Sequence, residues 1–202
     1  ALRTSHFALR HMDLTETKKT SDLLVEGVLL TAYRDTVVLP DGGESVREWV
    51  KHPGASAVVP LFADGTTVLL RQFRYPPRRT FIEVPAGKLD IEGEDPAEVA
   101  QRELQEEAGL AAGCLTPLGK TYPCIGYSDE VIYYFLAEDL TDARAHTEDD
   151  EFVEPFRLPF AEAVAMARRG EILDAKSEIA ILRAATYLDE REAEKRRSGD
   201  AA

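Results

Sequence analysis

The sequence has few cysteines and no long apolar run. Its 202 residues include only Cys114 and Cys124, which are too few for a disulfide framework and do not stand in a metal-ligand spacing. We therefore expect a reducing, cytoplasmic setting. No apolar stretch approaches the roughly 20 residues that a membrane helix needs, and no signal peptide is visible. These absences argue against a disulfide scaffold and against a membrane protein.

Positive charge is also scarce. The formal net charge is −13 at pH 7, which argues against a nucleic-acid backbone as partner. An anionic substrate would have to be met by local cations, supplied by a metal ion and by arginines. Hydrophobic residues make up 44% of the chain, which is enough for a core, and the length fits one domain or one domain with a small appendage.

The densest feature of the chain is the segment 87–110, GKLDIEGEDPAEVAQRELQEEAGL. Asp95 is a good N-cap, Pro96 suits the first helical position and Glu98 completes a capping box. Gly109 is a natural helix stop. At roughly 100° per residue, four residues share one apolar stripe. They are Ala97, Ala100, Leu104 and Ala108. The segment therefore predicts an amphipathic helix that begins near Pro96 and ends before Gly109.

Glutamates gather on one side of this expected helix. Glu103 and Glu107 lie beside the apolar stripe, and Glu106 lies further round on the same side. Glu98 and Arg102 point away and are expected to form an i,i+4 pair. Carboxylates pressed against buried surface are costly unless a positive charge joins them, and a divalent cation is the most plausible one. A cation held by carboxylates indicates phosphate chemistry. The plainer alternative is a solvated acidic helix face.

The same segment resembles the Nudix box, G-x5-E-x7-R-E-U-x-E-E-x-G-U with U apolar. From Glu94 onward every fixed position agrees: Glu94, Arg102, Glu103, Leu104, Glu106, Glu107, Gly109 and Leu110. One departure precedes them, because six residues rather than five separate Gly87 from Glu94. The extra residue leaves the helix carboxylates untouched and lies in the loop that holds Asp90 and Glu92.

The whole chain divides into four segments. Residues 1–20 are polar and are expected to be irregular, and residues 21–52 predict two or three antiparallel strands with a DGG turn. Residues 53–190 alternate strands with the box helix and end in two helices, at 160–170 and 176–194. Residues 191–202 form a charged tail. We expect an α+β fold, an α/β/α sandwich with a mixed sheet, plus a small N-terminal antiparallel sheet.

Resemblance extends beyond the box. HPGASAVVPL, VLLRQFRYP, FIEVPAGKLD, GYSDEVIYYFLAEDL and RRGEILDAKS look like the ADP-ribose pyrophosphatase branch of Nudix hydrolases. This resemblance implies hydrolysis of ADP-ribose or another nucleoside diphosphate sugar at the diphosphate, with Mg²⁺ or Mn²⁺. It also implies a homodimer formed through the N-terminal sheet, in which the partner contributes to the substrate pocket.

Site residues follow from the resemblance one position at a time. Glu103 and Glu107 are implied as the principal metal ligands, with Glu106 assisting and the carbonyl of Ala86 completing the shell. Glu107 is also counted with the catalytic groups. The oxygen donors suit Mg²⁺, which prefers oxygen ligands and usually keeps several waters.

Substrate contacts are implied for a second group. Arg74 looks like the arginine that meets the diphosphate, where a planar fork fits well, and Arg71 is the weaker candidate. The plain alternative for Arg74 is a surface charge at a strand end. Glu83 is either a substrate contact near the metals or a salt-bridged structural acid. Glu48 and Trp49 fall where the family contacts the nucleobase, although Trp49 also suits ordinary packing at a dimer interface.

The catalytic base is implied to come from the acidic loop HTEDDEFVEP. Glu148 and Glu151 are the candidates, followed by Asp150. A run of acids in a loop is often simply solvated, and the nearby His146 is more often incidental than catalytic.

One departure concerns specificity. The family's Ser-Pro-Gly-x-Ser/Thr-x-Glu loop corresponds here to residues 124–130, CIGYSDE. Gly126, Ser128 and Glu130 are kept, whereas Ile125 replaces the proline that stiffens the loop of ADP-ribose enzymes. GDP-mannose is therefore a rival substrate, and Tyr127 leaves room for a dinucleoside polyphosphate. A Nudix-fold ligand-sensing module is the alternative outside the enzymes, which the intact glutamates argue against.

Overall fold

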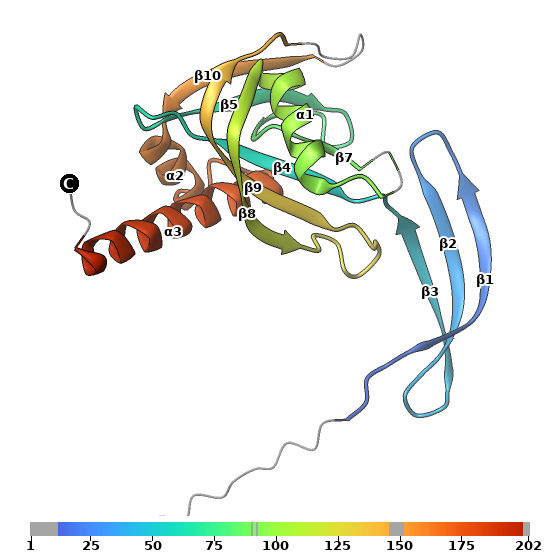
Figure 1. The fold of residues 1–202 in the computed structure, drawn as a ribbon. Coiled ribbons are helices and arrows are strands. Elements are labelled where there is room, and N and C mark those ends of the chain that lie inside the picture. The colour runs from blue at the N-terminus through green and yellow to red at the C-terminus, as the bar shows by residue number, and fades with distance from the viewer. Residues whose placement is uncertain (1–11, 90, 92, 146–151, 200–202) are drawn as a thin grey trace, which may run out of the picture. The chain divides into compact units, whose positions relative to one another are not determined.

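The computed structural model describes residues 12–89, 91, 93–145 and 152–199 (Figure 1). The chain divides into two compact units. The first holds the residues up to His52 together with Gly126–Asp129, and the second holds Pro53–Ile125 and the chain from Glu130 onward. Each unit is described separately below.

The first unit is a three-stranded antiparallel sheet in the order β1-β2-β3. Its strands are β1 (Thr17–Glu26), β2 (Thr31–Val38) and β3 (Glu44–Lys51). The expected DGG turn joins β2 to β3, with Gly42 at a φ of 86° that favours glycine. β1 begins at Thr17, inside the segment expected to be irregular, because Thr17 pairs with Val38 across the sheet. Alternation of side chains predicted these strands well except at this start.

Two sheets form the second unit, in the orders β10-β5-β6 and β7-β4-β9-β8. The strands are β4 (Ala55–Pro60), β5 (Thr66–Arg74), β6 (Arg79–Glu83), β7 (Ala86–Lys88), β8 (Leu110–Thr121), β9 (Ile132–Asp142) and β10 (Val153–Pro159). β4 pairs with β9 in parallel, whereas β4 with β7 and β8 with β9 are antiparallel. The four-stranded sheet is therefore mixed, as expected.

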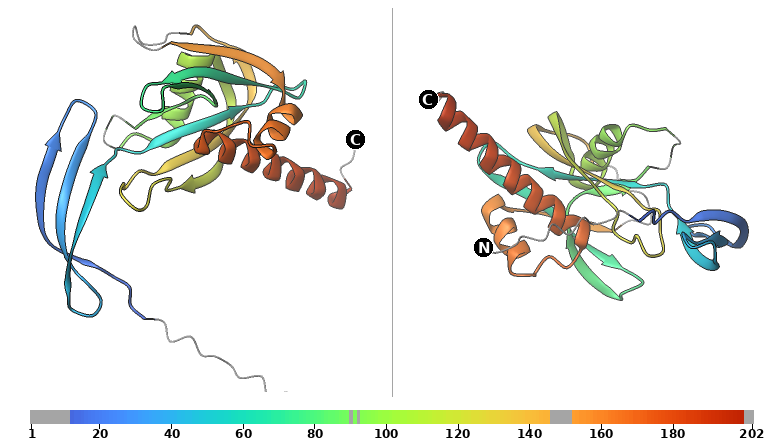
Figure 2. Two further views of the ribbon diagram at one scale, coloured as in Figure 1. Left: turned by 180° about the vertical axis from the view of Figure 1, so that it is seen from behind. Right: turned by 90° about the horizontal axis from the view of Figure 1, so that it is seen from below.

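Helices cover both faces of that mixed sheet. They are α1 (Pro96–Ala108), α2 (Phe160–Arg168) and α3 (Ala175–Ser198). Alternate residues of β4 face opposite ways: Val58 packs in a core with Ala100 and Leu104 of α1, whereas Ala57 and Val59 pack in a core with residues of α2 and α3. Figure 2 shows α1 and α3 on opposite sides of the central strands. This arrangement is the predicted α/β/α sandwich.

Two features of the sheets were not predicted. The run FIEVPA has the apolar character of one strand, but Val84 and Pro85 separate β6 from β7, which belong to different sheets. The start of β10 was expected to belong to the acidic loop HTEDDEFVEP. Among the described residues β10 is an edge strand that pairs with β5, and proline is tolerated at a sheet edge.

In the described ranges, none of the helices has the length and apolar character needed to cross a membrane.

Candidate active site

Helix α1 begins and ends where the sequence predicts. Asp95 is the N-cap, and its Oδ1 accepts a hydrogen bond from the backbone N of Ala97 at 2.9 Å. Gly109 ends the helix at a φ of 65°, in the left-handed conformation. Ala100 and Leu104 are fully buried, so the apolar stripe faces the core. This orientation fixes which way the glutamates of the helix point.

Glu107 is buried against strand β7. It is 4% exposed, and its Oε2 accepts a hydrogen bond from the backbone N of Ala86 at 2.8 Å. A carboxylate placed so deeply is costly to keep charged unless other groups stabilise it. Ala86 pairs with Ala57 of β4. Glu107 therefore joins the last turn of α1 to Ala86 at the start of β7. The carbonyl of Ala86 is the one predicted to be a metal ligand.

Glu103 lies directly over Gly87, the next residue of β7. A Cβ atom at position 87 would overlap both carboxylate oxygens of Glu103. A side chain at this position would have to displace the Glu103 carboxylate, and no unusual φ is involved. The first glycine of the Nudix box therefore makes room for one of the box carboxylates.

Arg102 crosses toward the carboxylates of the box. It donates to Glu94 Oε1, to Glu103 Oε1 at 3.4 Å and to the carbonyl of Lys88 at 3.3 Å. The expected pair between Glu98 and Arg102 is therefore wrong, because two carboxylates on the opposite side attract the guanidinium more than one exposed neighbour does. Partial burial would lower the pKa of Arg102, but the charges of Glu103 and Glu94 outweigh burial and raise it.

The carboxylates around β7 are suited to bind a divalent cation. Across the described parts of the chain, no group of three or more His, Cys, Asp or Glu side chains is already gathered as a metal site. However, Glu94 Oε2 is buried without a hydrogen-bond partner in those parts. The donors around β7 are all oxygens, from Glu94, Glu103 and Glu107, which is the donor set that a hard cation prefers. We conclude that the residues fit such an ion.

Arg74 and Glu83 form a bidentate pair at the ends of β5 and β6. Arg74 Nε and Nη2 donate to the two oxygens of Glu83 at 2.8 and 2.7 Å. Burial by itself would raise the pKa of Glu83, but the bonds and charges of Arg74 and Lys176 outweigh it, so the pKa is lowered. The pKa of Arg74 is raised, chiefly by its hydrogen bond to Glu83. Glu83 is therefore a charged acid at neutral pH.

Lys176 is the residue of this cluster that sequence reasoning missed. Its Nζ donates to Glu83 Oε2 and to Asp174 Oδ2, the latter at 2.9 Å. Asp174 is the N-cap of α3 and accepts from Ser177 N. The D-A-K-S sequence at a helix start signals a cap, but it does not signal a partner 93 positions away.

The other residues predicted on this unit lie apart from the cluster or pair elsewhere. Glu106 lines an open groove of about 620 Å³ along α1, together with Ala97, Glu98, Gln101, Arg102, Gln105 and Leu115. Arg71 pairs with Glu154 at 3.2 Å and stacks on Phe156, so it is occupied by β10. Glu130 is half-buried just before β9. Glu148 and Glu151, like Asp150 and His146, lie outside the described residues.

The residues predicted for the nucleobase belong to the first unit. Trp49 stacks on Tyr33 with ring centroids 5.1 Å apart, and its Nε1 donates to Asp35 at 3.0 Å. Asp35 is buried and also accepts from Ser21 Oγ at 2.6 Å. Glu48 is exposed and accepts from Arg34 at 2.6 Å. Asp35 was not predicted, although it holds the indole in one orientation.

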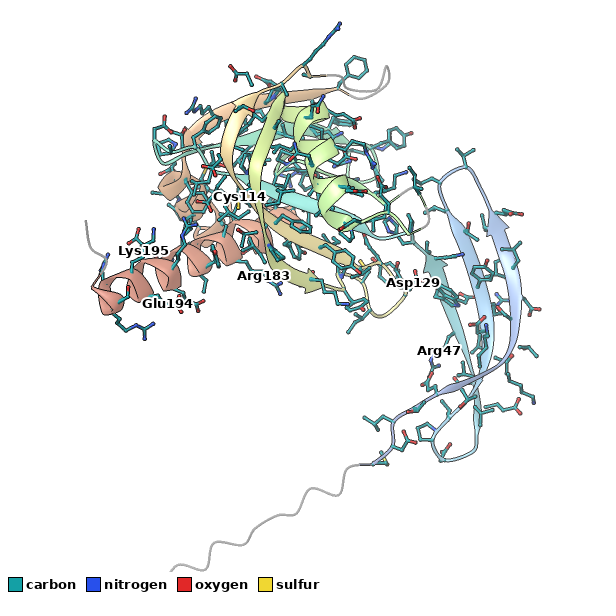
Figure 3. The ribbon with its side chains drawn as sticks, viewed as in Figure 1. Arg47, Cys114, Asp129, Arg183, Glu194 and Lys195 are labelled. Atoms are coloured by element: carbon teal, nitrogen blue, oxygen red, sulfur yellow. The ribbon has the colours of Figure 1, made fainter. Side chains whose placement is uncertain are left out.

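The loop 126–129 joins this unit through its backbone and through the side chain of Asp129. Val50 N donates to the carbonyl of Tyr127 at 2.8 Å, and Ser128 forms a bridge with Val50. Asp129, labelled in Figure 3, accepts from His52 N at 2.8 Å. A Cβ at Gly126 would meet nothing within 4 Å. Ile125, which precedes this loop, is 83% exposed.

Comparison with known proteins decides the family. The family model described as NUDIX domain matches residues 51–177, which is more than half of the chain. The chain belongs to the NUDIX family. The Nudix box identified above lies wholly inside the matched range, and Nudix hydrolases act with a divalent metal.

Relatives and a solved structure agree with this membership. The chain is 38% identical over 182 residues to an ADP-ribose pyrophosphatase of Bacillus subtilis (strain 168), covering 89% of this chain and 96% of the relative. It is 33% identical over 153 residues to a GDP-mannose pyrophosphatase of Yersinia enterocolitica, covering 69% and 79%. An ADP compounds hydrolase structure has the same fold, with a TM-score of 0.76 at 22% identity over 87% of this chain and 95% of that one.

Proposed function

We propose that this Nudix pyrophosphatase hydrolyses the diphosphate bond of nucleoside diphosphate sugars, with ADP-ribose as the first candidate substrate. The observation that carries the proposal is the folding of the Nudix-box carboxylates onto β7, where Glu107 meets Ala86 N and Glu103 covers Gly87. Water attacks one phosphorus, the bond from that phosphorus to the bridging oxygen breaks, and a nucleoside monophosphate and a sugar phosphate leave.

The metal ion of the proposal is Mg²⁺, with Mn²⁺ as a substitute. Glu103, Glu107 and the carbonyl of Ala86 would hold it, with Glu106 assisting and the unpartnered oxygen of Glu94 beside them. When bound, the cation offsets the negative charge of the diphosphate. Water activation is assigned to the acidic loop, with Glu148 or Glu151 as the base.

Arg74 is the proposed diphosphate contact. A guanidinium binds phosphate oxygens in a planar, bidentate way that an ammonium does not reproduce. Glu83 holds one edge of this guanidinium through Nε and Nη2. In the described chain, Arg71 is turned toward Glu154, which supports Arg74 as the stronger candidate. Glu83 then acts by orienting the arginine.

Residues of the N-terminal unit, together with Glu130 of the second unit, are proposed for the remaining contacts. Trp49, stacked on Tyr33, offers an aromatic surface for the nucleobase, and Glu48 offers an acceptor for its hydrogen bonds. Gly126, Ser128 and Glu130 are proposed for the sugar-bearing side. The active form is proposed to be a homodimer in the cytoplasm. The presence of only two cysteines in the sequence fits a reducing compartment.

GDP-mannose is the second candidate substrate. Ile125 stands where ADP-ribose enzymes carry a stiffening proline, and relatives named GDP-mannose pyrophosphatase match at 33% identity. In this proposal a loop that lacks the proline and exposes Ile125 accepts more than one sugar.

Product release from a substrate panel tests the function. Purified protein with Mg²⁺ is offered ADP-ribose, GDP-mannose, a dinucleotide and a dinucleoside polyphosphate, and the nucleoside monophosphates are quantified. The expected result is turnover of at least one nucleoside diphosphate sugar with Mg²⁺ and loss of turnover with EDTA. Turnover of only the dinucleoside polyphosphate would replace the substrate class. Binding without turnover of any panel member would favour a ligand-sensing module.

A further inference from the structure

Glu83 ends β6 as a nearly buried carboxylate that two cations share. Its side chain is 3% exposed, and the side chain of Lys176 is 16% exposed. Arg74 occupies both oxygens of Glu83, and Lys176 Nζ donates to Oε2 as well. Arg74 reaches Glu83 from the neighbouring strand, whereas Lys176 reaches it from the first turn of α3. One carboxylate therefore has a cation on each side.

The first turn of α3 is tied to Glu83, the last residue of β6, and to Val84, which follows it. Lys176 binds Glu83, and Ser177 Oγ accepts from the backbone N of Val84 at 2.9 Å. Asp174 Oδ2 organises this turn, because it accepts from Lys176 Nζ at 2.9 Å and from Ser177 Oγ at 2.5 Å. Lys176 thus has little freedom to leave Glu83.

Charge balance gives Lys176 a role beyond packing. A single carboxylate paired with Arg74 would cancel the positive charge that a diphosphate needs. Lys176 adds a second cation, which is shared with Asp174, so the two cations and two carboxylates of this cluster balance. Without the ammonium the cluster would carry a net negative charge, which would repel a diphosphate. An apolar side chain would be cheaper to bury at this position than an ammonium, which argues that the charge itself matters.

The orientation of the Arg74 guanidinium also supports a role for Lys176 beyond packing. A guanidinium carries five N–H donors on a planar fork, and Arg74 uses the Nε–Nη2 edge on Glu83. The Nη1–Nη2 edge is the one with which a guanidinium held in this way can approach an anion. Lys176 keeps Glu83 where it fixes that orientation.

We propose that Lys176 is a positioning residue that balances and orients Glu83, so that Arg74 presents its second edge to the diphosphate of the substrate. This inference rests on the proposed function, since it takes Arg74 as the diphosphate contact. Lys176 acts through Glu83 and does not itself touch the substrate.

A double-mutant cycle tests the proposal with ADP-ribose and Mg²⁺. Lys176→Met raises KM about tenfold while kcat changes little, because binding of the anion is lost in ground and transition states alike. In a Glu83→Gln background the carboxylate charge is gone, so Lys176→Met then changes KM by less than about twofold. Equal effects in both backgrounds, or an effect on kcat alone, overturn the proposal.

Control variants separate charge from folding. Lys195→Met removes one exposed ammonium from the same helix (Figure 3) and leaves KM unchanged. Lys176→Arg restores KM to within about threefold of the wild type, since the charge is kept. Thermal unfolding of each variant checks the fold. If Lys176→Met does not fold, Lys176→Gln replaces it with the same expected rise in KM.

Arg74→Ala distinguishes failure of the proposed Arg74–diphosphate contact from failure of the Lys176 proposal. If this variant keeps the wild-type KM, Arg74 is not the diphosphate contact, and this part of the proposed function fails together with the Lys176 proposal. If Arg74→Ala raises KM but Lys176 and Glu83 act additively, only the Lys176 proposal fails.

Discussion

At the scale of single residues, the site depends on how closely a carboxylate can approach a backbone. Glu103 occupies the space that a side chain at position 87 would fill. Glu107 accepts a hydrogen bond from the backbone N of Ala86, the residue before Gly87 in β7. Both contacts link the box helix to one short strand, so small changes on either side are expected to displace the carboxylates.

Gly87→Ala tests this close approach. The added methyl overlaps the Glu103 carboxylate, so we expect Glu103 to be displaced and the apparent affinity for Mg²⁺ to fall at least about tenfold. Gly27→Ala is the control, because a Cβ there would lie 3.4 Å from the nearest atom, which is ordinary contact. The measurement is turnover against Mg²⁺ concentration, and an unchanged Mg²⁺ curve in Gly87→Ala would contradict the argument.

Glu103→Gln and Glu107→Gln test the carboxylates themselves. Each loses a charge and a ligand, so turnover is expected to fall by about two orders of magnitude or more while the fold persists. Glu98→Gln on the same helix removes an equal charge outside the set proposed to hold the ion and is expected to keep turnover. Circular dichroism checks the fold. Wild-type-like turnover of both variants at saturating Mg²⁺ would refute the metal assignment.

Helical spacing explains why some of these residues could be predicted and others could not. Glu103 and Glu107 follow from a local period that places them beside the apolar stripe. Lys176 does not, because Glu83, the carboxylate it binds, is 93 positions away and reaches it only through tertiary packing. Arg102 was misread for the same reason. Its local neighbour Glu98 was obvious, but Glu94 and Glu103 attract it in the folded chain.

At the scale of elements, β9 and α3 are joined by an ion pair on the sheet face. Arg191 Nη1 and Nη2 donate to the two oxygens of Glu138 at 2.6 and 2.8 Å. The hydrogen bonds from Arg191 lower the pKa of Glu138. α3 extends to Ser198, beyond the position where the charged tail was expected to begin, and this pair anchors its second half.

Acid sensitivity follows from that pair. Because the folded pKa of Glu138 lies below its unfolded value of about 4.3, the pair stabilises the fold above that pH and loses its effect as pH falls through the folded pKa. Glu138→Gln is expected to lower the free energy of unfolding by about 1 kcal/mol at neutral pH and by less near pH 3. Urea unfolding at both pH values measures this.

The matched control for this prediction is Glu192→Gln. Glu192 pairs with Arg196 on the same helix at 3.0 Å, but both side chains are well exposed. Exposed i,i+4 pairs contribute only a few tenths of a kcal/mol, so this variant is expected to behave like the wild type at both pH values. If Glu138→Gln lowers the free energy of unfolding by the same amount at both pH values, the stabilisation does not come from the charge of Glu138.

β10 illustrates why elements were predicted unevenly. Strands with alternating or continuous apolar residues, such as β4 and β9, are evident from the sequence. β10 contains two prolines, and its strand character comes from pairing with β5 over seven residues. Non-local pairing of this kind leaves no local periodicity to detect.

At the scale of the whole molecule, the N-terminal sheet leaves much apolar surface uncovered in a single chain. Every residue of β1 is exposed, including Leu23 at 51% and Val25 at 50%. Val28, Leu29 and Leu30 in the turn that follows are also exposed. Three short strands without a helix above them cannot bury such surface by themselves. A second copy of the chain is the covering that the Nudix resemblance implies.

Assembly can therefore be tested through β1. The wild type is expected to sediment at twice the 22.4 kDa of one chain at micromolar concentration. Leu23→Lys with Val25→Lys places two charges on the surface proposed to be covered, and we expect the dimer to dissociate because unpaired charges are costly to bury. Leu173→Lys, at an equally exposed leucine of the second unit, is expected to leave the mass unchanged. A wild-type monomer with full turnover would refute the dimer, and an intact dimer in the double variant would move its interface away from β1.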